Sequence, residues 1–287
     1  MVKLHKTEAR SVTGEKLYIP PRPAESHKGD YGKILLLGGS VGYTGAPCLC
    51  ALGALRGGAG LVYLGVPEEI YPILAARAPA EAMPFPRTEA SLQARLVAAD
   101  VCACGPGMGR SEGTLAAVRA VLTGTSGPVV LDADALWAFR ALDGAVQRTA
   151  SAVVLTPHEG EFALLLNRPV QNRETDALAY AREHNAVVVL KGHRTLCAFP
   201  TGELYRVEAG NPGMATGGSG DVLTGVMAAL LARFEPEAAV LTAVWLHADA
   251  GDICAQTIGE TGMTASDIAA ALPAAERRLQ ENYFKLF

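Results

Sequence analysis

The sequence predicts an α/β fold in which a mostly parallel central sheet is covered by helices. Short apolar runs of strand length alternate with longer stretches of helical periodicity, as repeated βαβ units require. Several of the runs are apolar at nearly every position, which is typical of strands buried on both faces. With 287 residues, of which 49% are hydrophobic and 19% charged, the chain is long enough to bury a large core.

The expected elements follow one another in a regular order. The strands are Lys33–Leu37, Leu61–Val66, Asp100–Cys104, Pro128–Asp132, Ala152–Thr156 and Ala186–Leu190. An antiparallel hairpin of Thr195–Phe199 and Leu204–Val207 is expected late in the sheet. The helices are Ala46–Arg56, Glu112–Leu122, Ala133–Ala141, Glu159–Leu166, Asn172–His184, Val240–Gln256 and Ala265–Leu279, and the chain is expected to be mainly helical from Asp221 onward.

The chain divides into a short extension and one domain. Residues 1–30 are polar and contain Pro20, Pro21 and Pro23, so we expect them to form an N-terminal extension or cap. Residues 31–287 contain no internal repeat, low-complexity tract or linker. A single domain is therefore the simplest interpretation of the rest.

Charge and hydropathy exclude several classes of function. A net charge of -4 and a pI near 5.9 give no basic surface for nucleic acid and no polybasic membrane anchor. The longest uncharged stretch, residues 34–55, is interrupted by glycines and a proline, and we interpret it as strand, loop and helix. Met1–Arg10 is charged and lacks the apolar core of a signal peptide. We therefore expect a cytoplasmic protein.

The six cysteines do not form a metal-binding pattern. Cys48 and Cys50 lie two positions apart on an expected helix and so face different directions, while Cys102 and Cys104 lie on an expected buried strand. No C-x-x-C motif or histidine partner completes a zinc site. We interpret these side chains as small buried thiols, and we expect no metal bound by a protein cage.

Polar or glycine-rich segments follow most of the expected strands. Because ligands bind beyond the carboxyl ends of parallel strands, their shared position predicts a binding site. The segments are Gly38–Gly45, Gly105–Gly109, Asp132–Asp134, Thr156–Glu159 and Lys191–His193.

The sharpest signal is the run Gly217-Gly218-Ser219-Gly220-Asp221. Its glycines allow backbone amides to surround an anion, and the helix that follows directs its positive end to the same point. Asp221 then lies beside a bound phosphate, where its carboxylate can take the proton from an attacking hydroxyl. The other interpretation is a tight turn whose aspartate is preferred at a helix start. We favour phosphoryl transfer to a hydroxyl.

Two common nucleotide-binding motifs are absent from the sequence. There is no G-x-x-x-x-G-K-[ST], so the chain is not a P-loop enzyme. The Gly38–Gly45 segment does not match G-x-G-x-x-G, the dinucleotide fingerprint.

Several segments, taken in order, closely resemble the ADP/ATP-dependent NAD(P)H-hydrate dehydratases. The resemblance covers roughly residues 26 to 275. It is carried by Gly45-Ala46-Pro47, by the segments 131–136, 155–162 and 191–195, and by Gly213–Gly225. It implies a ribokinase-like fold, which is a three-layer sandwich, and similarity to the family's stand-alone members rather than to those fused to an epimerase.

The resemblance also implies an activity. Members repair NADH or NADPH whose nicotinamide ring carries a hydroxyl at C6, that is, the (S)-hydrate. ADP in bacteria or ATP in eukaryotes phosphorylates this hydroxyl, with magnesium, and loss of phosphate restores the ring. For this chain the resemblance implies ADP as the preferred donor and a homotetrameric assembly.

Site residues follow from the same resemblance. Asp221 corresponds to the base, and also contacts the substrate. The residues that correspond to nucleotide-binding positions are Lys191, Gly192, His193, Arg194, Thr195, Gly217, Gly218 and Gly220. The remaining substrate contacts correspond to Ala46, Gly107 and His158.

Some of these residues have structural alternatives. Lys191 ends a buried strand and can extend its amine to the sheet edge without a functional role. His158 can cap the helix that begins at Glu159, and Asp132 and Asp134 can cap the helix that follows them.

The sequence departs from the family pattern at one position. Ala248 stands where the family usually has glycine, a change of one methyl group.

Two other functions compete with dehydration. A small-molecule kinase of the same fold would share Gly217–Asp221 and release its phosphorylated product intact. A nucleotide-binding regulatory module without turnover would tolerate loss of Asp221.

Overall fold

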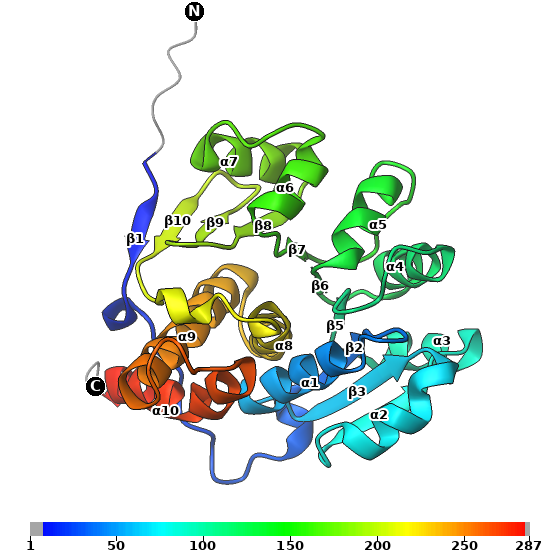
Figure 1. Cartoon of the computed structure of the whole chain (residues 1–287), viewed down its shortest axis with the longest axis horizontal. Coiled ribbons are helices and arrows are strands. Elements are labelled where there is room, and N and C mark those ends of the chain that lie inside the picture. Colours follow the sequence, from blue (N-terminus) through cyan, green and yellow to red (C-terminus); the bar gives the residue numbers. More distant parts are fainter. Residues whose placement is uncertain (1–7, 285–287) are drawn as a thin grey trace, which may run out of the picture.

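The computed structural model describes residues 8–284, which form one ten-stranded sheet between two layers of helices (Figure 1). The strands are β1 (Arg10–Val12), β2 (Lys33–Leu37), β3 (Leu61–Val66), β4 (Ala82–Pro86), β5 (Val101–Cys104), β6 (Val129–Leu131), β7 (Val153–Leu155), β8 (Val187–Leu190), β9 (Leu196–Ala198) and β10 (Leu204–Val207). Their order across the sheet is β1-β10-β9-β8-β7-β6-β5-β2-β3-β4. Only β9 of these runs antiparallel to its neighbours.

Ten α-helices within the described residues cover the sheet. They are α1 (Gly45–Arg56), α2 (Tyr71–Arg77), α3 (Glu89–Ala98), α4 (Glu112–Gly124), α5 (Asp134–Leu142), α6 (Glu159–Leu166), α7 (Arg173–Glu183), α8 (Ser219–Leu231), α9 (Pro236–Thr257) and α10 (Ala265–Phe284). Short 3-10 turns occupy Gly14–Lys16, Lys28–Tyr31, Glu68–Ile70 and Pro212–Met214. The expected mostly parallel α/β architecture is confirmed.

Alternation along the strands divides the core in two. On β2, Ile34 and Leu36 face the side covered by α1, α2, α8, α9 and α10, while Leu35 and Leu37 face α3 to α7. Successive side chains of a strand point to opposite faces, so a strand buried on both sides must be apolar throughout. The unbroken apolar runs in the sequence therefore reflect two packed faces.

Two strands, β1 and β4, and two helices, α2 and α3, were not predicted from the sequence. β4 contains Pro84 and Pro86, which cannot donate ladder hydrogen bonds; it forms the sheet edge, where prolines are tolerated. β1 has three residues, and α2 has only seven. α3 is the remaining helix that the sequence analysis missed.

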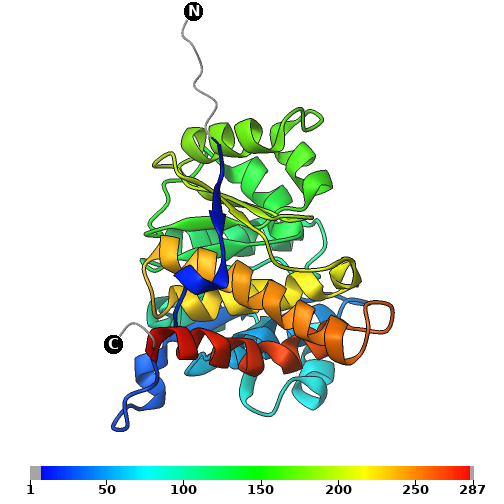
Figure 2. The same cartoon turned by 90° about the vertical axis from the view of Figure 1, so that its left-hand side faces the viewer.

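Residues 8–30 contribute to the fold, and residues 1–7 of the expected extension lie outside the described part of the chain. β1 extends the sheet in parallel beside β10 at the opposite edge from β4 (Figure 2). After it, the chain packs on α9 and α10, because Gly14 sits against the ring of Trp245 and its carbonyl accepts a hydrogen bond from Asn282 Nδ2 at 2.8 Å. The segment expected to be an extension or cap thus supplies an edge strand.

Helix α9 is long and apolar enough to cross a membrane by composition alone. It lies between α8, α10 and the sheet, however, and 72% of its most apolar window is buried inside the protein. Its apolar character is accounted for by its place in the core.

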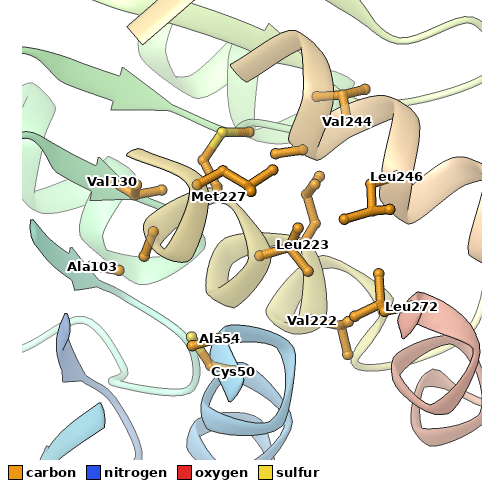
Figure 3. Packing of buried hydrophobic residues seen from close by; sticks show 14 of the residues in the cluster. Cys50, Ala54, Ala103, Val130, Val222, Leu223, Met227, Val244, Leu246 and Leu272 are labelled. Atoms are coloured by element: carbon orange, nitrogen blue, oxygen red, sulfur yellow. The ribbon is translucent and has the colours of Figure 1, made fainter. Parts of the chain in front are cut away.

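Helix α8 occupies the centre of the larger core cluster. Its side chains fill the space between the sheet, at Ala103 and Val130, and helices α1, α9 and α10 (Figure 3). Eleven of its thirteen residues are buried. Because α8 begins at the glycine-rich turn, its packing fixes where that turn lies.

The contact between α1 and α8 is made backbone to backbone. A Cβ on Gly53 of α1 would overlap the carbonyl oxygen of Val222, and one on Gly225 of α8 would lie 2.6 Å from the Ala54 nitrogen. Real Cβ atoms do not approach backbone this closely. Both positions therefore require glycine.

We predict that Gly53→Ala destabilises the protein, because the added methyl group forces α1 and α8 apart. Overpacking of this kind typically costs about 1–3 kcal/mol in the free energy of unfolding. Gly45→Ala in the same helix is the matched control, since its Cβ meets open space, and it should change stability by less than about 1 kcal/mol. Equal stability of the two variants in urea titrations would contradict the contact.

Candidate active site

A cavity of about 870 Å³ opens at the carboxyl edge of the sheet. It is lined by residues that follow β6, β7 and β8, by the segment between β10 and α8, and by α9. This is where the sequence analysis places a site. Of the predicted site residues, the lining includes Lys191–Thr195, His158, Gly220 and Asp221.

The glycine-rich turn presents unpaired amides to this cavity. Gly218 adopts a left-handed conformation with φ of 92°, and a side chain there would overlap Leu49 of α1. Within the described residues, no acceptor takes the N–H of Gly220 or that of Asp221, both in the first turn of α8. These two donors, at the positive end of a helix, are available to bind an anion.

Lys191 lies directly beneath the turn in a network of buried charges. Its Nζ is 2.7 Å from Oδ1 of Asp132 and 3.9 Å from Oε2 of Glu161. The other Asp132 oxygen accepts a hydrogen bond from Thr224 of α8 at 2.9 Å. Burial favours the neutral amine, but the two carboxylates outweigh it and raise the pKa of Lys191. The carboxylates therefore favour the charged form of the lysine.

The Lys191 amine also reaches the glycine-rich turn. A Cβ placed on Gly220 would lie 3.2 Å from Lys191 Nζ. Glycine at this position leaves room for the amine beside the turn. The positive charge and the two free amides therefore converge on one part of the cavity.

Asp221 is a half-buried carboxyl group with a strongly raised pKa. Burial and the nearby charge of Asp132 raise it to about 7, although Lys191 acts in the opposite direction. A carboxylate is most effective as a general base when its pKa lies near the working pH. The site thus supplies a base next to the anion-binding amides.

The purely structural roles considered for Lys191, Asp132 and Asp134 can be compared with their contacts in the structure. Lys191 does not extend to solvent: its side chain is 19% exposed and ion-paired with Asp132, itself only 2% exposed. Asp132 lines the cavity and caps no helix. Asp134 accepts the Gly109 N–H at 2.7 Å and so ties two loops together.

His158 both caps the start of α6 and lines the cavity. Its Nδ1 accepts the Glu161 N–H at 3.2 Å, and Glu161 Oε2 accepts the His158 N–H at 2.9 Å. This reciprocal capping box starts α6. His158 also lines the cavity, so capping holds it there.

Four predicted residues lie outside the cavity lining. Gly217 and Gly218 shape the turn behind Gly220. Ala46 and Gly107 lie against each other, since a Cβ on Gly107 would be 3.1 Å from that of Ala46. Ala46 lies in the first turn of α1 and Gly107 in the loop after β5, and neither lines the cavity.

Sequence reasoning missed several residues of the site. Glu161 and Thr224 complete the charge network, and Ser219 Oγ lies 3.3 Å from Nε2 of His247 on α9. Burial lowers the pKa of His247 to about 4, so its ring is neutral at the cavity wall. No local motif marks these contacts, because each joins elements distant in sequence.

Fold and site together define a protein of the ribokinase-like class. A ribokinase-like superfamily protein from Enterococcus faecalis matches with a TM-score of 0.85 and 30% identity, covering 98% of this chain and 100% of that one. An ADP/ATP-dependent NAD(P)H-hydrate dehydratase from Bacillus subtilis, co-crystallised with ATP/Mg²⁺, has a TM-score of 0.85 and 34% identity, covering 94% and 99%. The predicted ribokinase-like fold is confirmed.

Sequence comparison identifies the family. Residues 34–274 match the model for NAD(P)H-hydrate dehydratase, and the chain belongs to this family. The ADP-dependent (S)-NAD(P)H-hydrate dehydratase of Neisseria meningitidis is 40% identical over 87% of this chain and 86% of its own length. A bifunctional NAD(P)H-hydrate repair enzyme of Moorella thermoacetica is 42% identical over 92% of this chain and 52% of its own. The chain therefore spans about half the length of the bifunctional relatives it matches.

We predict that Asp221 makes stability fall as pH rises. Its pKa is about 7 in the folded protein and about 4 in an unfolded chain, so between these values only the folded state holds the proton. Asp221→Asn removes this titration, so it should raise the free energy of unfolding relative to wild type. The increase should be small near pH 4, grow to about 1 kcal/mol or more by pH 8, and then level off. Urea titrations across this range measure it. Parallel stability curves for the two proteins would contradict the raised pKa.

Proposed function

We propose that the protein catalyses nucleotide-dependent dehydration of the (S)-hydrate of NADH or NADPH. The observation that carries the proposal is Asp221, a carboxyl group with a pKa of about 7 beside two free helix amides and the Lys191 charge. A base and an anion-binding site in contact suit phosphoryl transfer to a hydroxyl. The names of the relatives from Neisseria meningitidis and Bacillus subtilis supply the substrate.

The chemistry proceeds in two steps. Asp221 accepts the proton of the C6 hydroxyl as its oxygen forms a bond to phosphorus and the bond to the departing nucleotide oxygen breaks. The C6–O bond then breaks with release of inorganic phosphate, and loss of a proton from C5 restores the ring double bond. ADP would leave as AMP, and ATP as ADP.

Each residue of the site has a role in the first step. The N–H groups of Gly220 and Asp221 and the Lys191 amine offset the charge that spreads over the transferred group. Asp132 and Glu161 hold Lys191 in place and keep it protonated. Nucleotide contacts are proposed for Gly192–Thr195, which line the same cavity.

Magnesium fits this site as an ion carried by the nucleotide. The described residues contain no group of three or more His, Cys, Asp or Glu side chains able to hold a metal. Asp132 and Glu161 are engaged with Lys191. Mg²⁺ commonly keeps several waters and binds through phosphates with one or two carboxylates. Asp221 lines the cavity and, among the described residues, forms no ion pair, so it is the carboxylate that fits this role. Bound there, the ion would neutralise phosphate charge.

The assembly and location are also proposed. A homotetramer in the cytoplasm is supported by the family resemblance. The acidic net charge of -4 supports a small-molecule substrate over nucleic acid.

We predict that purified protein restores the near-ultraviolet absorbance of NADH from its hydrate only when nucleotide and magnesium are present. ADP should support a higher initial rate than ATP, as the names of the relatives suggest. Equal rates without nucleotide would contradict the proposal. Accumulation of a phosphorylated dinucleotide, without recovered absorbance, would indicate a kinase instead.

We predict that Asp221→Asn lowers turnover by about 10²–10⁴-fold, the usual contribution of a general base. Nucleotide affinity should be preserved or slightly stronger, because the amides remain and a negative charge is removed. Asp134→Asn is the matched control, since its carboxylate serves a loop contact with Gly109 rather than the cavity. More than about a third of wild-type turnover in Asp221→Asn, with the variant folded, would exclude this base.

A further inference from the structure

The loop after β2 is firmly anchored yet exposes large apolar side chains. The Gly39 N–H donates to the Pro106 carbonyl at 2.8 Å, and Ser40 Oγ donates to the Gly107 carbonyl at 2.8 Å. Despite this anchoring, Val41 is 68% and Tyr43 is 65% exposed. Isolated exposed apolar residues are common, but two on one anchored loop at the carboxyl edge of the sheet point to an occupant.

A line of packing contacts along α1, the path, joins the glycine-rich turn before Asp221 to this loop. Gly218, beside the catalytic turn, packs against Leu49 of α1. Ala46 lies one helical turn before Leu49, about 5 Å along the axis, and contacts Gly107. A Cβ on Gly107 would in turn lie 3.0 Å from the Cβ of Tyr43. The N-terminal half of α1 thus leads from the catalytic turn to the exposed ring.

The path and the cavity lie on different sides of α8. Figure 1 shows α8 between β8, β9 and β10 on one side and α1, β2 and α2 on the other. No described residue of the loops after β2 or β5 lines the cavity. In phosphoryl transfer, the attacking and leaving oxygens lie roughly in line on opposite sides of phosphorus. A nucleotide in the cavity therefore directs the acceptor molecule onto this path.

The end of the path carries uncompensated positive charge. Nη1 of Arg77, on α2, is 3.5 Å from the Thr44 hydroxyl next to Tyr43. The side chain is exposed, and within the described residues no carboxylate forms an ion pair with it. Arg guanidinium groups bind phosphate oxygens well because their donors match the phosphate geometry.

We propose that Tyr43 and Arg77 form a binding site for the adenosine diphosphate half of the hydrated dinucleotide, with Tyr43 stacked on the adenine and Arg77 bound to the pyrophosphate. The proposal rests on the proposed function, which places the nicotinamide half at Asp221. An exposed aromatic ring on Tyr43 and a guanidinium held by the adjoining Thr44 match a base joined to phosphates. The reacting hydroxyl of the substrate then lies at Asp221 and its adenine at Tyr43, with the first two turns of α1 between them.

The test compares a dinucleotide with a mononucleotide substrate. Tyr43→Ala should raise KM for hydrated NADH by about 5–150-fold, the equivalent of about 1–3 kcal/mol of stacking on one base. The KM for ADP and kcat should stay unchanged, and Tyr43→Phe should retain wild-type KM. With hydrated reduced nicotinamide mononucleotide, which lacks the adenosine half, Tyr43→Ala and wild type should behave alike.

Arg77→Gln should also raise KM for hydrated NADH by about tenfold or more, because it removes a charged partner of phosphate. Val97→Ala and Arg119→Gln, exposed positions on α3 and α4, are the matched controls and should leave every constant unchanged. An unchanged KM in both site variants would overturn the proposal. An equal loss with the mononucleotide would overturn the adenine assignment.

Two further measurements separate the other outcomes. Calorimetric titration of hydrated NADH into protein lacking nucleotide should show the same weakening in Tyr43→Ala, so binding is read independently of turnover. If wild type binds but does not turn over, the proposed function fails while the binding site stands. If Tyr43→Ala changes the oligomeric state by light scattering, the loop is a subunit contact and the proposal is overturned.

Discussion

The direct contact between α1 and α8 is the constraint on which the site depends. Gly53 and Gly225 allow the two helix backbones to touch, and α8 is thereby held at the centre of the core. Its first turn carries the unpaired amides of Gly220 and Asp221, while α1 begins beside the loops after β2 and β5. One helix contact thus positions the proposed base, its glycine-rich turn and the surface proposed for the acceptor.

The electrostatics of the site follow from this placement. A buried lysine is stable only with paired carboxylates, and Asp132 and Glu161 provide them for Lys191. Asp132 acts on Asp221 as well, so the residue that keeps the lysine charged also raises the pKa of the base toward neutrality. Lys191 is therefore kept positively charged, as the proposed phosphate contact requires. Asp221 is able to take and release a proton, as the proposed base requires.

The sequence predicted the sheet, most helices and the glycine-rich turn at the cavity because these have local signals. Apolar runs mark buried strands, and the run of glycines before Asp221 marks the anion site. It did not predict β4, whose prolines are compatible only with an edge position that topology decides. Nor did it reveal the role of Asp132, since pairing with Lys191 joins residues 59 positions apart. Long-range charge pairs of this kind depend on strand order, which no motif encodes.

The most direct test of the account is the pH dependence of kcat/KM for hydrated NADH at saturating ADP. If Asp221 is the base, kcat/KM should rise about tenfold per pH unit below an apparent pKa of about 7 or higher, and then level off. The residual activity of Asp221→Asn should lack this acid limb, which separates the carboxyl group from titration of the nucleotide phosphates. A wild-type profile that is flat between about pH 5.5 and 8, or one that Asp221→Asn reproduces, would contradict the assignment.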